Sequence, residues 1–231
     1  MRLWRVLMGA LALCAVTNAV AQAPDPRAAL EAKAAAALAA KSWPDAESAS
    51  KQLVTIDPAR LDYRQTLATA QLNQGHYPDA LATIDAAIAL AAKSAPGTDP
   101  ARQKGALAVM LVTKGNIFLK QGKMPEAVAA YEKAAPLTAN PATAYFNICA
   151  VQYNAGKMPE AVAACDRAIA ADPKKADAYF IKGSALFGDA KIQNGKVVPS
   201  RDAMAALQQY LVLAPNGPHV ADVKAMLDAA K

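Results

Sequence analysis

The sequence predicts an all-α fold: a right-handed superhelical α-solenoid of about five helix pairs with one further helix at its C-terminal end. A nine-residue stretch, GKMPEAVAA, begins at Gly122 and returns at Gly156. The same interval separates Trp43-Pro from Tyr77-Pro. The composition, 54% hydrophobic with only 11 glycines, suits packed helices. A fixed period of this length, about 34 residues, is typical of arrays in which one helix pair is copied and stacked.

The N-terminal segment, residues 1–21, is expected to be a secretory signal peptide rather than part of the fold. Two arginines precede an apolar stretch at residues 6–16, and small residues precede a cleavage position after Ala21. The apolar stretch is too short for a comfortable transmembrane anchor. Cys14 follows a leucine, which is too large for lipoprotein processing, so we expect no lipid anchor. The sequence therefore predicts an exported, periplasmic protein whose mature chain, residues 22–231, is one repeat domain.

The period places the helix pairs along the mature chain. A proline at the start of the second helix in the first four pairs supports this phase, because proline suits the first helical turn. The expected pairs occupy residues 27–60, 61–94, 108–141, 142–175 and 176–217, and the closing helix occupies residues 218–230.

Two insertions interrupt the period. Tyr77 and Met124 occupy the same place in their pairs, but the interval between them exceeds the period, so extra residues fall between the second and third pairs. Proline and glycine turn signals occur at residues 96–100. A second insertion lies in the fifth pair. There Asn194-Gly195 between β-branched residues predicts a β-hairpin near residues 191–198 with a type I′ turn.

Residues of similar size recur at fixed positions in the last three pairs. They are Leu111, Gly115, Phe118, Ala127 and Tyr131, then Tyr145, Cys149, Ala161 and Cys165, then Tyr179, Gly183, Ala203 and Leu207. A large apolar or aromatic residue and a small residue on the first helix, with alanine and a further residue on the second, make the chain similar to the tetratricopeptide repeat family. The match covers residues 27–217, and the first two repeats fit it less well.

The resemblance implies a concave groove, lined by the first helix of each pair, that binds a peptide or protein partner without covalent chemistry. The main residues that the family spacing places in this groove are Asn116, Leu119, Phe146, Asn147, Tyr153, Phe180, Ser184 and Phe187, with Asp62, Gln65, Thr69 and Val112 nearer the N-terminus. Aromatic residues on an exposed surface often dominate binding. The alternative is that these rings pack beneath the hairpin or the last helix.

Some members of the family hold the C-terminal carboxylate of a partner with two asparagines and several basic residues. Asn116 and Asn147 match the asparagine positions, but Val112, Asp177 and Ile181 stand where the basic residues would be. A carboxylate would therefore lack its charge-assisted hydrogen bonds. We do not expect this binding mode here.

No pattern in the sequence predicts an enzyme, a metal site or a cofactor. His76 and His219 are far apart, and neither belongs to a cluster with metal-ligand spacing. The 25 basic and 19 acidic residues are interspersed, which argues against a nucleic-acid-binding surface. We expect a protein or peptide partner. The alternative function is a structural, self-associating component, for which a homo-oligomer is possible.

Cys149 and Cys165 lie on the two helices of the fourth pair. An oxidising compartment favours a disulfide between two such residues. Antiparallel pairing, however, is expected to set Cys149 beside Ala161 and Cys165 beside Tyr145, with the two cysteines about a turn apart. The sequence therefore favours two buried free thiols over a disulfide.

Overall fold

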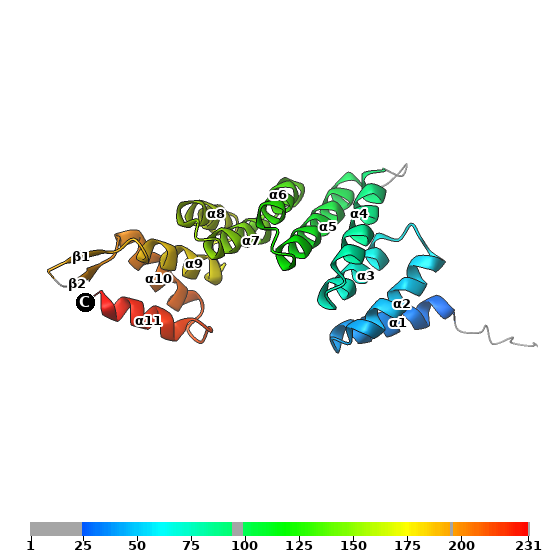
Figure 1. Ribbon diagram of the computed structural model, residues 1–231, viewed down its shortest axis with the longest axis horizontal. Helices are drawn as coiled ribbons and strands as arrows, with labels where there is room; N and C mark the ends of the chain where they lie inside the picture. Colours follow the sequence, from blue (N-terminus) through cyan, green and yellow to red (C-terminus); the bar gives the residue numbers. More distant parts are fainter. Residues whose placement is uncertain (1–24, 94–98, 195, 231) are drawn as a thin grey trace, which may run out of the picture.

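The computed structural model describes residues 25–93, 99–194 and 196–230, and it consists of stacked helix pairs followed by a single helix (Figure 1). The predicted signal peptide, residues 1–21, lies outside the described residues. The helices of the five pairs are α1 (Pro26–Ala39) and α2 (Trp43–Ile56), α3 (Leu61–Asn73) and α4 (Tyr77–Ala92), α5 (Pro100–Lys120) and α6 (Met124–Ala134), α7 (Ala142–Asn154) and α8 (Met158–Ala171), and α9 (Ala176–Phe187) and α10 (Arg201–Leu213). A 3₁₀ turn, η1 (Ala135–Leu137), follows α6, and α11 (Val220–Ala229) follows the last pair.

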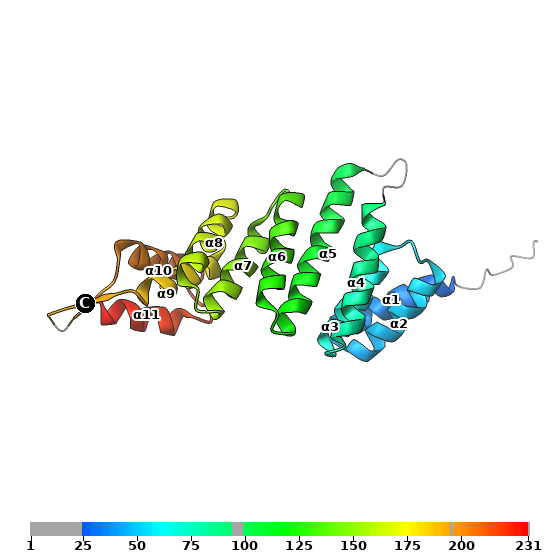
Figure 2. The same ribbon diagram turned by 45° about the horizontal axis from the view of Figure 1, so that its top comes forward.

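The array is elongated, with α1 and α2 at one end and α11 at the other (Figures 1 and 2). Each pair packs antiparallel, and its second helix packs against the first helix of the next pair. The first helices α3 and α5, and likewise α7 and α9, also contact each other directly. Buried side chains therefore form a chain of small cores along the seams, one shared by α3, α4 and α5 and another by α5 to α9. The predicted α-solenoid is confirmed.

A residue with positive φ ends the first helix of each of the first four pairs. Gly75, Gly122 and Gly156 have φ values of 79°, 73° and 75°. The residue after each glycine donates its N–H to a carbonyl five residues back, as in Lys123 N–H to Phe118 O at 2.9 Å. This pattern satisfies carbonyls at the helix end, and glycine adopts it without steric penalty. In the first pair the same position is Lys41, with φ of 56°.

The insertion between the second and third pairs is partly helical. Helix α5 has 21 residues, whereas α3 and α7 have 13 each, and the additional residues lie at its N-terminal end. Asp99 caps that end by accepting a hydrogen bond from Ala101 N–H at 3.0 Å. Residues 94–98 of the predicted turn lie outside the described residues. The extra residues thus extend α5 beyond its neighbours, as Figure 2 shows.

The predicted hairpin is confirmed. Strand β1 (Lys191–Gln193) pairs antiparallel with β2 (Lys196–Val198), and Ile192 faces Val197 across the pair. Asn194 has φ of 52°, as a type I′ turn requires. Figure 1 shows the hairpin projecting from the end of the array beside α11.

Helix α11 is held to the array by the buried side chain of Tyr210. The Tyr210 hydroxyl accepts a hydrogen bond from His219 N–H at 3.0 Å, which fixes the turn before α11. The apolar contact is made by Leu207, Tyr210 and Val223, all fully buried. The last helix thereby covers the face of α10 that would otherwise be exposed, as repeat arrays require.

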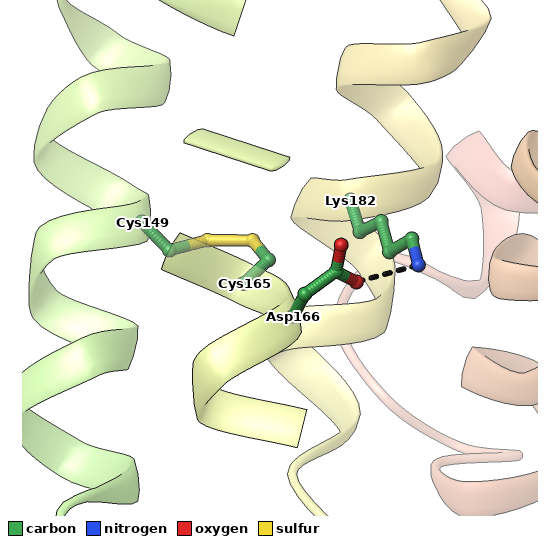
Figure 3. Close-up of a disulfide and its surroundings, with 4 residues drawn as sticks. All are labelled: Cys149, Cys165, Asp166 and Lys182. Atoms are coloured by element: carbon green, nitrogen blue, oxygen red, sulfur yellow. Dashed lines mark hydrogen bonds and ion pairs between the residues drawn. A yellow bond between two sulfur atoms is a disulfide. The ribbon is translucent and has the colours of Figure 1, made fainter. Parts of the chain in front are cut away.

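The expectation of two free thiols is wrong: Cys149 and Cys165 form a disulfide between α7 and α8 (Figure 3). Their Cα atoms are 5.0 Å apart, well inside the usual range for a disulfide. The sequence-based expectation placed α8 at the wrong axial offset relative to α7, with Cys149 beside Ala161. In the structure the position of Cys149 faces the position of Cys165 across the pair, so the two sulfur atoms meet.

We predict that Lys41→Gly increases the free energy of unfolding by about 1 kcal/mol, because a residue with a side chain is strained at positive φ. The reverse change, Gly122→Ala, should lower it by about 1 kcal/mol. No atom lies within 4 Å of a Cβ placed at Gly122, so the backbone conformation alone is responsible. Urea unfolding followed by circular dichroism measures both changes. Equal effects of the same sign would contradict this account of the turns.

We predict that loss of the Cys149–Cys165 disulfide lowers the stability of the fourth repeat. The bond joins cysteines with a sequence separation of 16. Closure of such a loop contributes about 3 kcal/mol by restricting the unfolded chain. Urea unfolding of the oxidised protein, the reduced protein and the Cys149→Ala/Cys165→Ala variant measures the change. The reduced protein and the double variant should have the same free energy of unfolding, and adding reductant should not change that of the variant.

Candidate functional site

Three cavities follow one another across the first helices of the array. The largest, about 600 Å³, lies between α3 and α5. A cavity of about 330 Å³ between α1 and α3 shares Arg60 and Asp62 with it, and one of about 280 Å³ between α5 and α7 shares Val109. The shared residues make these cavities neighbours in one row. We call this row, from α1 to α7, the first-helix groove.

The wall of the largest cavity carries an ion pair. Arg60 binds Asp62 with two hydrogen bonds, Nε to Oδ1 at 2.9 Å and Nη2 to Oδ2 at 2.5 Å. Hydrogen bonding from Arg60 lowers the pKa of Asp62, and the same pair raises the pKa of Arg60. The guanidinium also lies 4.7 Å from the ring centre of Tyr63. Asp62 is therefore ionised at neutral pH and offsets the charge of Arg60.

Arg102 stands on the extended part of α5, also beside the largest cavity. It is exposed, and it has no hydrogen bond or ion pair among residues 25–93, 99–194 and 196–230. A further cavity of about 260 Å³ shares Arg102 with the largest one, and Lys93 also lines it. Lys93 has no side-chain partner within the same described ranges. The uncompensated charge on this side of the groove is positive.

The floor of the groove is apolar and is contributed mostly by α5. Val109 is 54% exposed, and it lines two cavities. Ala106 and Met110 continue the apolar surface in the largest cavity. Gln65 Nε2 donates to Thr113 Oγ1 at 2.6 Å and ties α3 to α5 beneath it. The largest cavity therefore combines an apolar floor with charged side chains on its wall.

Most of the residues predicted for the C-terminal half of the groove contact other side chains of the array or are buried. Asn116 Oδ1 accepts a hydrogen bond from the buried Tyr131 hydroxyl at 2.7 Å, and burial raises the pKa of Tyr131 to about 12. Ser184 is buried. Those that are half-buried are Leu119, Phe146, Asn147, Tyr153, Phe180 and Phe187. None of these eight residues lines the first-helix groove.

Two of the predicted rings contact the C-terminal elements. Phe180 stacks on the imidazole of His219, with ring centres 3.9 Å apart and planes parallel within 1°. Phe187 packs against the cluster that joins α10 to α11. Phe180 therefore helps to hold the segment before the last helix against the array, as the packing alternative for these rings expects. Phe146 lies farther along the array, where the Lys175 ammonium is 4.8 Å from the centre of its ring.

Of the residues predicted nearer the N-terminus, Asp62, Gln65 and Val112 line the first-helix groove. Sequence reasoning missed Arg60, Arg102 and Val109. The insertion before the third pair was the one sequence signal that could have pointed to Arg102, because residues added before a first helix can lengthen it and enlarge the surface that it presents. The repeat pattern carried no information about Arg102, since it lies on the part of α5 that other pairs lack.

Within the described ranges, no group of three or more histidine, cysteine, aspartate or glutamate side chains is arranged to hold a metal ion. In the same part of the chain, no helix combines the length and the apolar character needed to cross a membrane.

Comparison with protein families decides the identity of the repeats. A profile described as "TPR repeat" matches residues 115–156, and a second, described as "Tetratricopeptide repeat", matches residues 151–194. The chain is a tetratricopeptide repeat protein. The two matches cover most of the third pair, the whole of the fourth and part of the fifth, where the motif residues are most complete. A comparison with the sequences of curated proteins finds no match.

Several solved structures share the fold of this tetratricopeptide repeat protein. A Pseudomonas aeruginosa PilF structure has a TM-score of 0.64 and 16% identity, covering 88% of this chain and 86% of PilF. A structure of MamA from Desulfovibrio magneticus RS-1, from residue 41 to its end, has a TM-score of 0.59 and 15% identity, and the match covers 83% of this chain and 94% of the MamA chain. YrrB, described as a TPR protein with an unusual peptide-binding site, has a TM-score of 0.53 and 16% identity, and the match covers 83% of this chain and 88% of YrrB. At these identities the likeness concerns the fold.

Proposed function

We propose that this protein is an exported scaffold that binds a segment of a protein partner in the first-helix groove. The observation that carries the proposal is the exposed Val109 at the junction of two cavities, with apolar neighbours below it and charged groups beside it. An apolar surface of this kind, rimmed by polar groups, usually marks an interaction site. The similarity in fold to YrrB, whose description names a peptide-binding site, supports the same proposal.

Export is the second part of the proposal. It is supported by the N-terminal pattern of charged, apolar and small residues at 1–21. The disulfide between Cys149 and Cys165 supports it independently, because such bonds persist in oxidising compartments such as the periplasm. The proposal assigns no catalytic step to the chain.

Self-association is the competing function. The observation that favours it is a pair of highly exposed apolar side chains in the C-terminal region, Ile192 at 77% on β1 and Val212 at 72% on α10. Side chains of this kind can pair with a second copy of the same surface. A protein that acts in this way would change its mass with concentration and would not need the groove.

We predict that Val109→Glu removes partner binding and leaves the fold intact. An exposed side chain can be charged without unfolding the helix, but a carboxylate on the apolar floor would have to be desolvated when the partner binds. The matched control is Val212→Glu, an exposed valine outside the groove. Crosslinking and affinity capture from the native envelope fraction compare both variants with the unaltered protein. Helical content by circular dichroism verifies folding. Partners that are retained by Val109→Glu and lost from Val212→Glu would refute groove binding and support self-association or a different surface.

For export, we predict that protein recovered from its native cells begins at Gln22 and contains the Cys149–Cys165 bond. Intact mass before and after reduction and alkylation measures both features in one experiment. A chain that retains Met1, with both cysteines alkylated without prior reduction, would rule out export.

A further inference from the structure

The extension of α5 gives the groove a site that the other repeats lack, and its charge indicates the chemistry of the partner. We propose that the cavity between α3 and α5 takes an internal acidic stretch of the partner chain, with a neighbouring aliphatic side chain seated on the floor. This inference rests on the proposed function and specifies which class of segment the groove selects. It concerns residues of the extension and of the α2–α3 connection, not the asparagine positions considered above.

The charge of the site is the first argument. Arg60 is offset by Asp62, to which it is doubly hydrogen-bonded. Arg102, which lines both adjoining cavities, and Lys93 in the smaller one have no acidic partner within the described residues. Asp99, the nearby acid at the start of α5, is engaged as the cap of Ala101 N–H. Arg102 therefore brings one uncompensated cation to the site, and Lys93 adds a second in the adjoining smaller cavity. An anionic ligand complements this charge.

The shape of the site is the second argument. A volume of about 600 Å³ is within the range of ligand pockets, which is roughly 300–1,000 Å³. Its floor is formed by Ala106, Val109 and Met110, so an aliphatic side chain can be buried there while a carboxylate reaches Arg102. The cavity also adjoins others on both sides, through Arg60 toward α1 and through Val109 toward α7. A row of adjoining cavities fits an extended chain better than a small anion.

The position of Arg102 is the third argument. It lies in the N-terminal part of α5 that makes this helix eight residues longer than α3 or α7. Lys104 is two residues away and also exposed, but it does not line the cavities on either side of Arg102. Residues two apart on a helix point about 200° apart, because each residue turns the helix by about 100°. Lys104 therefore provides a control with the same charge on the same helix.

The test uses the full mature protein and a fluorescein-labelled twelve-residue peptide that contains two leucines among glutamates. Fluorescence anisotropy measures its affinity. Arg102→Glu should weaken binding by about tenfold, the loss that corresponds to one hydrogen bond to a charged group. Lys104→Glu makes the same change in net charge and should leave the affinity within about twofold, the difference expected for a screened surface charge. Peptides with lysine in place of glutamate, or serine in place of leucine, should bind more weakly than the original.

The inference would be overturned if Arg102→Glu and Lys104→Glu weaken binding equally, or if the lysine peptide or the serine peptide binds as tightly as the original. A leucine–glutamate dipeptide that competes as strongly as the long peptide would also overturn it, by identifying a small-molecule site instead. If Val109→Glu removes native partners but Arg102→Glu does not, the groove is correct and the acidic selectivity is wrong. If neither variant alters capture, the proposed function itself fails.

Discussion

The close approach of the two helices within each pair is the constraint on which the rest of the array depends. In the third pair, Gly115 faces Tyr131 so closely that a Cβ atom would overlap the ring. In the fifth, a Cβ at Gly183 would lie 2.7 Å from Leu207 Cδ2. A small residue on the first helix therefore accommodates a large one on the second, and the interhelical distance is set by that contact. This contact recurs at the same repeat position along the chain.

The same position explains the disulfide. Cys149 and Cys165 have a sequence separation of 16. Gly115 and Tyr131 are separated by the same interval, and so are the buried residues Ala68 and Ile84 of the second pair. Cysteine is small enough for the first position, and the second position points at it. The bond thus replaces a packing contact with a covalent one at a place where the helices already meet.

An ion pair outside the disulfide-bonded contact joins the fourth pair to the fifth. Asp166 on α8 and Lys182 on α9 form this ion pair, with Lys182 Nζ 2.6 Å from Asp166 Oδ1 (Figure 3). The disulfide therefore joins the helices within one pair, whereas the ion pair joins one pair to the next.

The departure from regularity is what forms the candidate site. Were α5 as short as α3 and α7, Arg102 and Ala106 would be absent from the wall and floor of the largest cavity. In the C-terminal pairs the apolar first-helix side chains Phe146, Tyr153 and Phe180 are instead half-buried against neighbouring residues of the array. The three cavities of the first-helix groove therefore lie around the longer helix and in the N-terminal part of the array.

The sequence by itself determined the period, the helix pairs, the breaks at the turn glycines and the hairpin, because these depend on residues close together in the chain. It also indicated Asp62, Gln65 and Val112 as first-helix positions on the open face. The tertiary structure alone decided which residues meet across helices: the Cys149–Cys165 bond, the stacking of Phe180 on His219, and the cavity beside Arg102. These contacts depend on the axial displacement of one helix relative to another and on the length of the inserted helix. Local periodicity does not specify either quantity, since a helix keeps the same pattern when it slides along its partner.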